Sequence, residues 1–198
     1  MVDAILARHG ESELSVVSRT NGDPSVPVAL TEAGREQARR LGVELEQAEL
    51  GLCVVSEFPR AQETADIALE GRSVPRLVLP ELNDIRFGRF EGEALADYRA
   101  WARAHGPEEP VPGGDSRADT VRRYTRAFRT ILARPEESIL VVAHSLPIRY
   151  VLDSADGRSP AAALEQVPYA EPFVLMHDEL ATAVERLEAW GERPAWTT

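Results

Sequence analysis

Short apolar runs alternate with helical patterns along this chain, and this alternation constrains the fold more than any other feature. Residues 2–7, 52–55 and 139–143 are apolar runs of strand length, and segments with helix-start signals or helical spacing lie between them. Strands that alternate with helices imply crossover connections and a largely parallel sheet covered on both faces. The sequence therefore predicts one three-layer α/β/α domain over residues 1–198, with a mostly parallel central sheet.

The remaining elements follow from local signals. Thr31 is an N-cap residue that precedes apolar residues at helical spacing, and Pro59 marks the first turn of the next helix. Residues 12–30 lack periodicity and contain turn residues, so they predict a long loop. Residues 180–190 fit either a helix or the return arm of a hairpin. Further strands are expected at 74–79 and 173–176, and further helices at 93–105, 115–133 and 146–155.

Composition excludes several classes of protein. The formal net charge of −11 opposes binding to nucleic acid or to an anionic membrane, and no apolar run is long enough to cross a bilayer. Cys53 is the only cysteine, which excludes an internal disulfide and a thiolate metal cluster. The first residues do not resemble a signal peptide, so we expect a cytosolic protein. The apolar tail over 172–190 leaves a homo-oligomer open.

Polar residues follow each of the three most apolar strands. In open α/β sheets, ligands bind at the carboxyl ends of the strands. If these strands are parallel neighbours, their trailing side chains converge at one edge of the sheet. The residues concerned are Arg8 and His9, Ser56 and Arg60, and His144 and Ser145.

Two histidines and two arginines together suit phosphoryl transfer. Arginine matches phosphate oxygens with a planar charged fork, and imidazole can carry a phosphoryl group at neutral pH. Two arginines and a protonated second histidine would make a metal ion unnecessary, so we expect no metal and no cofactor. Each histidine alone is more often a structural residue. A metal site built on His9, His144 and Asp84 is a further alternative, disfavoured because Arg8 would repel a cation.

Five blocks of sequence, in order over residues 4–152, resemble the histidine phosphatase superfamily, which includes the cofactor-dependent phosphoglycerate mutases. The blocks are the Arg-His-Gly run at 6–12, the Thr-Glu-Ala-Gly helix at 31–38, the Ser-to-Ala element at 56–65, the acid-bearing loop at 82–92 and the strand ending in histidine at 139–144. Single blocks are weak signals, whereas five in order are specific. The resemblance implies a phosphoglycerate mutase-like fold.

The resemblance also implies residue roles. His9 would be the phosphorylated nucleophile, and Arg8, Arg60 and His144 would form the phosphate pocket. Asp84 stands where the family carries the acid that protonates the leaving oxygen, although members more often have glutamate there. Glu81 is the rival donor. An acid that works near neutral pH needs a raised pKa, which burial and a bound phosphate would each supply.

Several substrate contacts are expected as well. Ser15 replaces the asparagine that the family often carries six residues after the nucleophile, and Ser145 opens the segment where members usually have a small pair. Asn21 and Gly22 lie in the loop where members offer backbone groups to the substrate. Gly22 could instead serve the turn alone, because glycine reaches positive φ without strain.

The substrate is expected to be a small phosphorylated metabolite, and hydrolysis is favoured over mutase activity. A mutase usually needs extra basic residues after the acid loop, whereas residues 93–117 mix acids with arginines, and the run 112–116 resembles the phosphatase branch. A non-catalytic phosphate-binding module is a third alternative, disfavoured because the histidines and arginines are all present. The charged residues used in this interpretation are Glu108, Glu109, Asp115, Arg99, Arg103 and Arg117.

Overall fold

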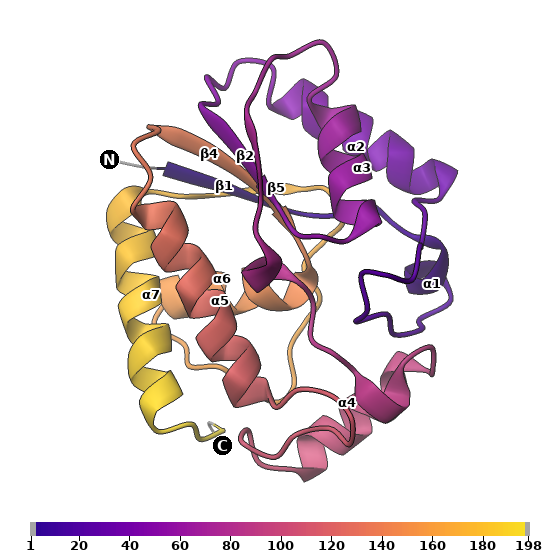
Figure 1. The fold of residues 1–198 in the computed structure, drawn as a ribbon. Helices are drawn as coiled ribbons and strands as arrows, with labels where there is room; N and C mark the ends of the chain where they lie inside the picture. Colours follow the sequence, from indigo (N-terminus) through magenta and orange to yellow (C-terminus); the bar gives the residue numbers. More distant parts are fainter. Residues whose placement is uncertain (1–2, 197–198) are drawn as a thin grey trace.

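The structure is a computed structural model that describes residues 3–196, and these residues form one α/β domain around a five-stranded sheet (Figure 1). The expected strand start at residue 2 and the ends of the expected domain lie outside the described residues. The strands are β1 (Asp3–Arg8), β2 (Leu52–Val55), β3 (Arg76–Val78), β4 (Ser138–Ala143) and β5 (Pro172–Leu175). The helices are α1 (Glu13–Val16), α2 (Glu32–Glu44), α3 (Pro59–Ala68), α4 (Leu95–Ala104), α5 (Arg117–Leu132), α6 (Ser145–Ala155) and α7 (His177–Glu192), with single 3₁₀ turns at Pro80–Leu82 and Gly88–Phe90.

The three chemically interesting strands are neighbours at the centre of the sheet. The strand order is β3-β2-β4-β1-β5, and only β5 runs antiparallel. In the register of the parallel pairs, Arg8 lies opposite Ala143 and Val55 lies opposite Val142. The carboxyl ends of β1, β2 and β4 therefore meet at one edge, as the sequence predicts.

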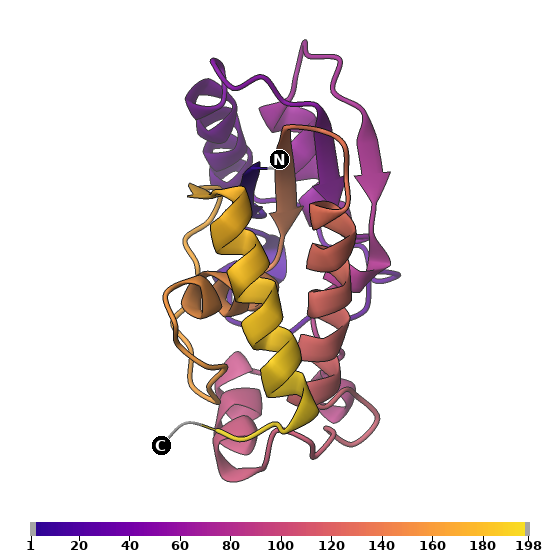
Figure 2. The ribbon, with the colours of Figure 1, turned by 90° about the vertical axis from the view of Figure 1, so that its left-hand side faces the viewer.

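The sheet is buried on both faces because alternate residues of each central strand point to opposite sides. Leu6, Val54 and Val141 pack with α5, α6 and α7, whereas Cys53 and Val142 pack with α2 and α3. Figure 2 shows α5 and α7 side by side over one face of the sheet. The expected three-layer arrangement is confirmed.

Local signals place most helix starts correctly. The Thr31 side chain accepts a hydrogen bond from the Gly34 N–H, and Pro59 occupies the first turn of α3. Three expectations were wrong, left open or too long. The expected loop over 12–30 contains the short helix α1, and the ambiguous segment 180–190 lies within α7. The strand expected at 74–79 is shorter, because only Arg76–Val78 pairs with β2.

Helix α4 belongs to a small separate core rather than to either face of the sheet. Its buried residues Tyr98 and Ala102 pack with Ile85, Phe87 and Val111 from the acid loop and the following turn. In Figure 1, α4 lies apart from the sheet, at the lower end of the molecule. α4 therefore lies beside the carboxyl ends of the central strands. No helix among the described residues is long and apolar enough to span a membrane.

Candidate active site

The ends of β1 and β4 bring the two predicted histidines together. The His9 N–H donates to the carbonyl oxygen of Ala143 at 2.9 Å, which extends the parallel pairing by one residue. His144 follows directly after β4 and caps α6. The two imidazole centroids lie 5.3 Å apart, and both side chains are buried.

The backbone after His9 is held by a close approach to neighbouring segments. The Gly10 N–H donates to Thr64 Oγ1 at 3.0 Å, and the same hydroxyl donates to the Arg60 carbonyl at 2.7 Å. A Cβ atom at Gly10 would overlap with the carbonyl oxygen of Gly34, so only glycine fits there. Thr64 therefore ties the turn after His9 to the first turn of α3.

Hydrogen bonds fix the tautomer of His9. Its Nδ1 lies 2.7 Å from the Gly10 carbonyl oxygen, which can only accept, so Nδ1 carries the proton. Its Nε2 accepts from Arg60 Nε at 3.1 Å, so this nitrogen carries the lone pair. Burial, followed by the charges of Arg60 and Arg8, holds the pKa of His9 well below its ordinary value. The imidazole is therefore neutral and nucleophilic at neutral pH.

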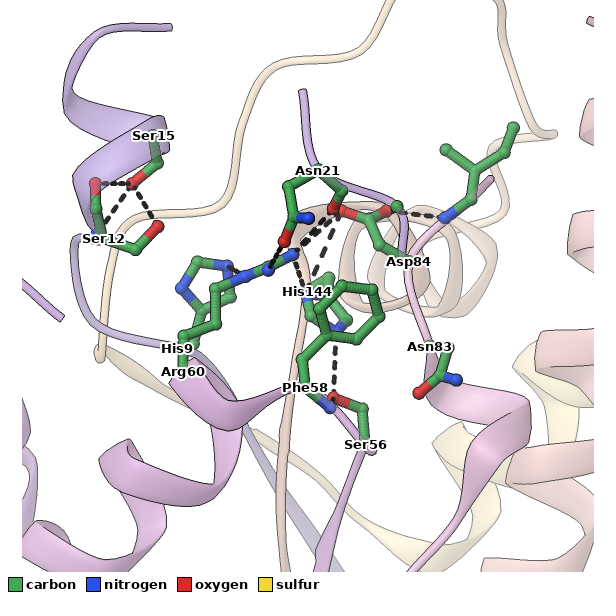
Figure 3. A network of polar contacts seen from close by, with 12 residues as sticks. His9, Ser12, Ser15, Asn21, Ser56, Phe58, Arg60, Asn83, Asp84 and His144 are labelled. Carbon is green, nitrogen blue, oxygen red and sulfur yellow. Dashed lines mark hydrogen bonds and ion pairs between the residues drawn. The ribbon is translucent and has the colours of Figure 1, made fainter. Parts of the chain in front are cut away.

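Arg60 connects the parts of the cluster (Figure 3). Besides His9, its guanidinium donates to the side-chain oxygen of Asn21, to the Asn21 carbonyl oxygen at 3.1 Å and to His144 Nδ1 at 3.3 Å. Its Nη2 lies 3.9 Å from Asp84 Oδ2. Burial lowers the pKa of Arg60 to about 10, which still leaves the group charged at neutral pH. Asn21 thus contacts Arg60 and lines the cavity beside it.

Arg8 has one buried hydrogen-bonding group left without a partner. Its Nη1 donates to the Val167 carbonyl at 2.8 Å, and its guanidinium carbon lies 3.8 Å from the centroid of the Tyr169 ring. Its Nε is buried and has no hydrogen-bond partner among residues 3–196. A buried donor without a partner is rare, and at the edge of a cavity it fits an anionic ligand.

His144 is neutral in the free protein, contrary to the expected protonated form. Its Nε2 lies 2.9 Å from Ser56 Oγ, and its Nδ1 accepts from Arg60. Phe58 packs edge-on against the ring, with centroids 4.6 Å apart. Burial, and then the positive charges of Arg60 and Arg8, hold its pKa well below the ordinary value. A bound phosphate dianion would reverse part of this charge effect.

Asp84, rather than Glu81, faces the cluster. Asp84 Oδ2 lies 3.9 Å from both Arg60 Nη2 and His144 Nδ1, and its side chain is 20% exposed. Burial raises its pKa above the ordinary value against the opposing charge of Arg60. Glu81 does not line the cavity, and its backbone carbonyl oxygen accepts a hydrogen bond from Arg123.

The chain matches a known protein family over most of its length. The model of the histidine phosphatase superfamily (branch 1) matches residues 4–189, a range that contains every residue of the cluster. The chain belongs to the histidine phosphatase superfamily. The sequence-based resemblance and the fold expected from it are confirmed.

Relatives in the histidine phosphatase superfamily carry two kinds of name. The adenosylcobalamin/alpha-ribazole phosphatase of Salmonella typhimurium is 36% identical over 148 residues, which are 70% of this chain and 72% of the relative. A 2,3-bisphosphoglycerate-dependent phosphoglycerate mutase 2 of Gloeobacter violaceus is 32% identical over 190 residues, which are 87% of this chain and 84% of the relative. The solved structure of Bacillus stearothermophilus YhfR superposes with a TM-score of 0.76 at 30% identity, over 88% of this chain and 90% of that chain.

Three of the expected substrate-binding residues form hydrogen bonds within the protein. The Ser15 hydroxyl borders the cavity, yet it hydrogen-bonds to the backbone and side chain of Ser12, away from the cluster (Figure 3). Ser145 borders the cavity while its hydroxyl accepts from the Val167 N–H at 2.9 Å. Gly22 does not line the cavity, and its N–H donates to Glu91 at 2.9 Å; the expected backbone contact with substrate stays a prediction.

Gly22 is also not required for a left-handed turn, because its φ is not positive. A Cβ at this position would overlap with the carbonyl oxygen of Ile85, so the close approach of two loops explains the glycine. Glu91 joins the same loops, accepting from the N–H groups of Gly22 and Phe87. These contacts fix the acid loop against the loop that carries Asn21.

The arginines of the insertion are separated from its acids, which the sequence did not indicate. Arg99, Arg103 and Arg117 line the same cavity as His9, together with Arg19 and Arg149. The three acids lie outside the cavity and pair elsewhere: Glu108 with Arg122, Glu109 with His105, and Asp115 with Arg86 and Arg123. Mixed charge in this segment therefore does not disfavour a mutase, since of its charged residues only the arginines line the cavity.

The metal alternative finds no ligand set. Among residues 3–196, no group of three or more His, Cys, Asp or Glu side chains is placed to hold a metal ion. Arg60 Nε donates a hydrogen bond to His9 Nε2, and Arg60 Nη2 donates to His144 Nδ1. The cluster presents donors and positive charge, which are complementary to an anion.

Proposed function

We propose that this protein hydrolyses phosphomonoesters through a covalent phosphohistidine on His9. One observation supports this most strongly: the neutral His9 directs its Nε2 lone pair toward the charged Arg60 at 3.1 Å, beside the unpartnered Nε of Arg8. A nucleophile held between two phosphate-binding cations suits attack on a phosphoryl group.

In the first step, His9 Nε2 forms a bond to phosphorus as the bond to the leaving oxygen breaks. Arg8, Arg60 and His144 contact the equatorial oxygens, where positive charge stabilises the transition state. Asp84 enters this step protonated and donates its proton to the leaving oxygen, which departs as an alcohol. The raised pKa of Asp84 makes the protonated form available at higher pH than an ordinary carboxyl would allow.

In the second step, water replaces the alcohol. The Asp84 carboxylate accepts a proton from the water, whose oxygen attacks phosphorus as the bond to His9 Nε2 breaks. Inorganic phosphate leaves, and His9 and Asp84 return to their starting protonation states. The chain supplies the nucleophile, the acid and the positive charge itself, so the proposed reaction is independent of a metal ion and of a cofactor.

The proton donor is assigned by a pair of variants. Asp84→Asn should slow turnover about 100-fold or more for alkyl phosphates, whose leaving oxygen needs the proton, and far less for 4-nitrophenyl phosphate. Glu81→Gln is the matched control and should resemble the wild type on both. Loss of alkyl phosphate turnover in the control instead of in Asp84→Asn would contradict the assignment.

Phosphoryl transfer to a second hydroxyl is the alternative function. The five further arginines in the cavity favour it, because a mutase must retain a strongly anionic substrate while the phosphoryl group is on the enzyme. The names of the relatives include both activities. Phosphate release measured beside interconversion of 3- and 2-phosphoglycerate distinguishes the two: we expect release to exceed interconversion.

A further inference from the structure

The two arginines beside His9 are held in different ways. Arg60 donates four hydrogen bonds, which fix both the position and the plane of its guanidinium. Arg8 Nη1 donates to the Val167 carbonyl oxygen at 2.8 Å, while Arg8 Nε is buried without a partner among residues 3–196. One hydrogen bond to the backbone leaves a planar guanidinium free to turn about that contact. The orientation of Arg8 Nε therefore needs a second constraint.

The ring of Tyr169 supplies this constraint. The Arg8 guanidinium carbon lies over the ring, 3.8 Å from its centroid, so the cation rests on the aromatic face. Stacking of this kind defines the plane of a guanidinium, whereas the hydrogen bond from Nη1 defines its place. The Tyr169 ring also lies close to the nucleophile, with its centroid 6.1 Å from that of the His9 imidazole.

Backbone contacts tie the segment that carries Tyr169 to the ends of β1 and β4. Tyr169 forms a parallel bridge with Arg8, and the Ala170 N–H donates to the Arg8 carbonyl oxygen at 2.9 Å. The Val167 N–H donates to Ser145 Oγ at 2.9 Å, in the first turn of α6. The ring on Arg8 is thus attached to the same framework that carries both histidines.

The chain makes a strained turn directly after Tyr169. Ala170 is buried and has a φ of 49°, in the left-handed region that favours glycine. A residue with a Cβ keeps this conformation only where its surroundings require it. Here the turn leads the chain from Tyr169 into β5, where Pro172 lies opposite Ala7. The position of the Tyr169 ring is therefore defined by packed backbone on both sides.

Tyr169 also separates Arg8 from a second cavity, which measures about 270 Å³ and lies between α2 and the start of β5. Gln37, Arg40 and Glu44 of α2 line this second cavity together with Tyr169, whereas Arg8 does not. The space is large enough for several water molecules. Water that reached Arg8 from this side would screen its charge and weaken its effect on a bound phosphate.

We propose that Tyr169 is a positioning residue for phosphoryl transfer: its ring fixes the plane of Arg8 and shields the guanidinium from the second cavity. The inference rests on the proposed function, because that function gives Arg8 its phosphate. Tyr169 acts through Arg8 alone and makes no contact with the reacting atoms.

Binding of inorganic phosphate tests this role without turnover. Tyr169→Leu keeps an apolar side chain but removes the aromatic face, so calorimetry should give a dissociation constant about 10-fold higher than that of the wild type. Tyr169→Met, a second non-aromatic variant, should show the same loss. Tyr169→Phe keeps the face and should stay within about threefold of the wild type.

Phe173→Leu is the matched control, because it also replaces an aromatic ring in this part of the chain. Phe173 is partly buried on β5, opposite Leu6, and lines neither cavity. Its phosphate affinity should equal that of the wild type. Thermal melts of all variants set an assay temperature at which each is folded.

A double-mutant cycle separates positioning from a general structural role. With 4-nitrophenyl phosphate, Tyr169→Leu should lower kcat/KM about 10-fold in the wild type, mainly through kcat, because Arg8 contacts oxygens that gain charge in the transition state. In the Arg8→Gln background the same change should alter kcat/KM less than about threefold, since no guanidinium remains to be held.

Three results would overturn the inference: wild-type phosphate affinity in Tyr169→Leu, an equal loss in Tyr169→Phe, or a full 10-fold fall in kcat/KM in the Arg8→Gln background. Failure of the proposed function gives a different pattern. If the variants change phosphate binding as expected but the wild type hydrolyses no ester, the proposed function fails and the role of Tyr169 in holding Arg8 stands.

Discussion

Replacing Arg60 with lysine tests whether the geometry of the guanidinium, rather than its charge, organises the site. Arg60 makes four hydrogen bonds with three residues: one to His9, two to Asn21 and one to His144. A lysine ammonium keeps the charge but is a single point donor on a flexible chain. It cannot reach acceptors that surround a planar fork, so at least two buried acceptors lose their partner.

The expected loss follows from those contacts. Two hydrogen bonds at about 1–2 kcal/mol each amount to about 2–4 kcal/mol, or roughly 30- to 1000-fold in kcat/KM. Most of the loss should be in kcat, because the fork also binds the oxygens that gain charge in the transition state. Release of phosphate from 4-nitrophenyl phosphate, followed continuously, measures both constants.

The control for this variant is Arg126→Lys, whose side chain is exposed on α5 and donates only to the Arg122 carbonyl. It should leave kcat/KM unchanged. The melting temperature of Arg60→Lys should fall by several degrees, because at least two buried acceptors lose their partner, so both proteins are assayed well below that temperature. A kcat/KM within threefold of the wild type would refute the reasoning, because charge alone would then suffice.

Four further predictions concern the pH dependence of stability, the pH dependence of activity, a buried hydrogen bond and metal removal. Burial holds the pKa values of His9 and His144 below the ordinary value of about 6.5, so only the unfolded chain takes up these protons as the pH falls. The free energy of unfolding should therefore decrease below pH ~6.5 by up to about 1.4 kcal/mol per pH unit per histidine. In urea melts, the free energy of unfolding of His144→Asn should depend less steeply on pH than that of the wild type. The kcat/KM profile should rise as His9 loses its proton and fall as Asp84 loses its own, with the falling limb absent in Asp84→Asn; a retained limb would exclude Asp84 as the acid. Thr64→Val leaves the buried Gly10 N–H unpaired and should cost about 1–3 kcal/mol in urea melts, whereas a chelator such as EDTA should leave phosphate release unchanged.

The sequence is enough to predict which strand ends meet, because this prediction requires only that the strands are buried and that their connections are parallel. The register that places Arg8 opposite Ala143 then fixes His9 beside His144 without any further information. The helix start at Thr31 was equally predictable, since its side-chain hydroxyl caps the Gly34 N–H locally. These features arise from contacts near in sequence or from simple topology.

The features that sequence reasoning missed depend on contacts between distant loops. Tyr169 packs on Arg8 and lies 6.1 Å from the His9 ring, yet it belongs to a tail with no clear periodicity. The direction of Arg117 is set by two tyrosine hydroxyls on different helices, which a count of charges cannot show. The neutral state of His144 likewise depends on complete burial, and residue type alone does not indicate burial.

The central claim concerns a covalent bond to one imidazole nitrogen. Rapid quenching in alkali during turnover of a phosphate ester labelled in the phosphoryl group should give a labelled protein whose adduct is stable to alkali and lost in acid. Peptide mass spectrometry should place that phosphoryl group on His9, and His9→Ala should show neither the adduct nor phosphate release. Full phosphate release by His9→Ala, or turnover by the wild type with no labelled histidine at any quench time, would contradict the account.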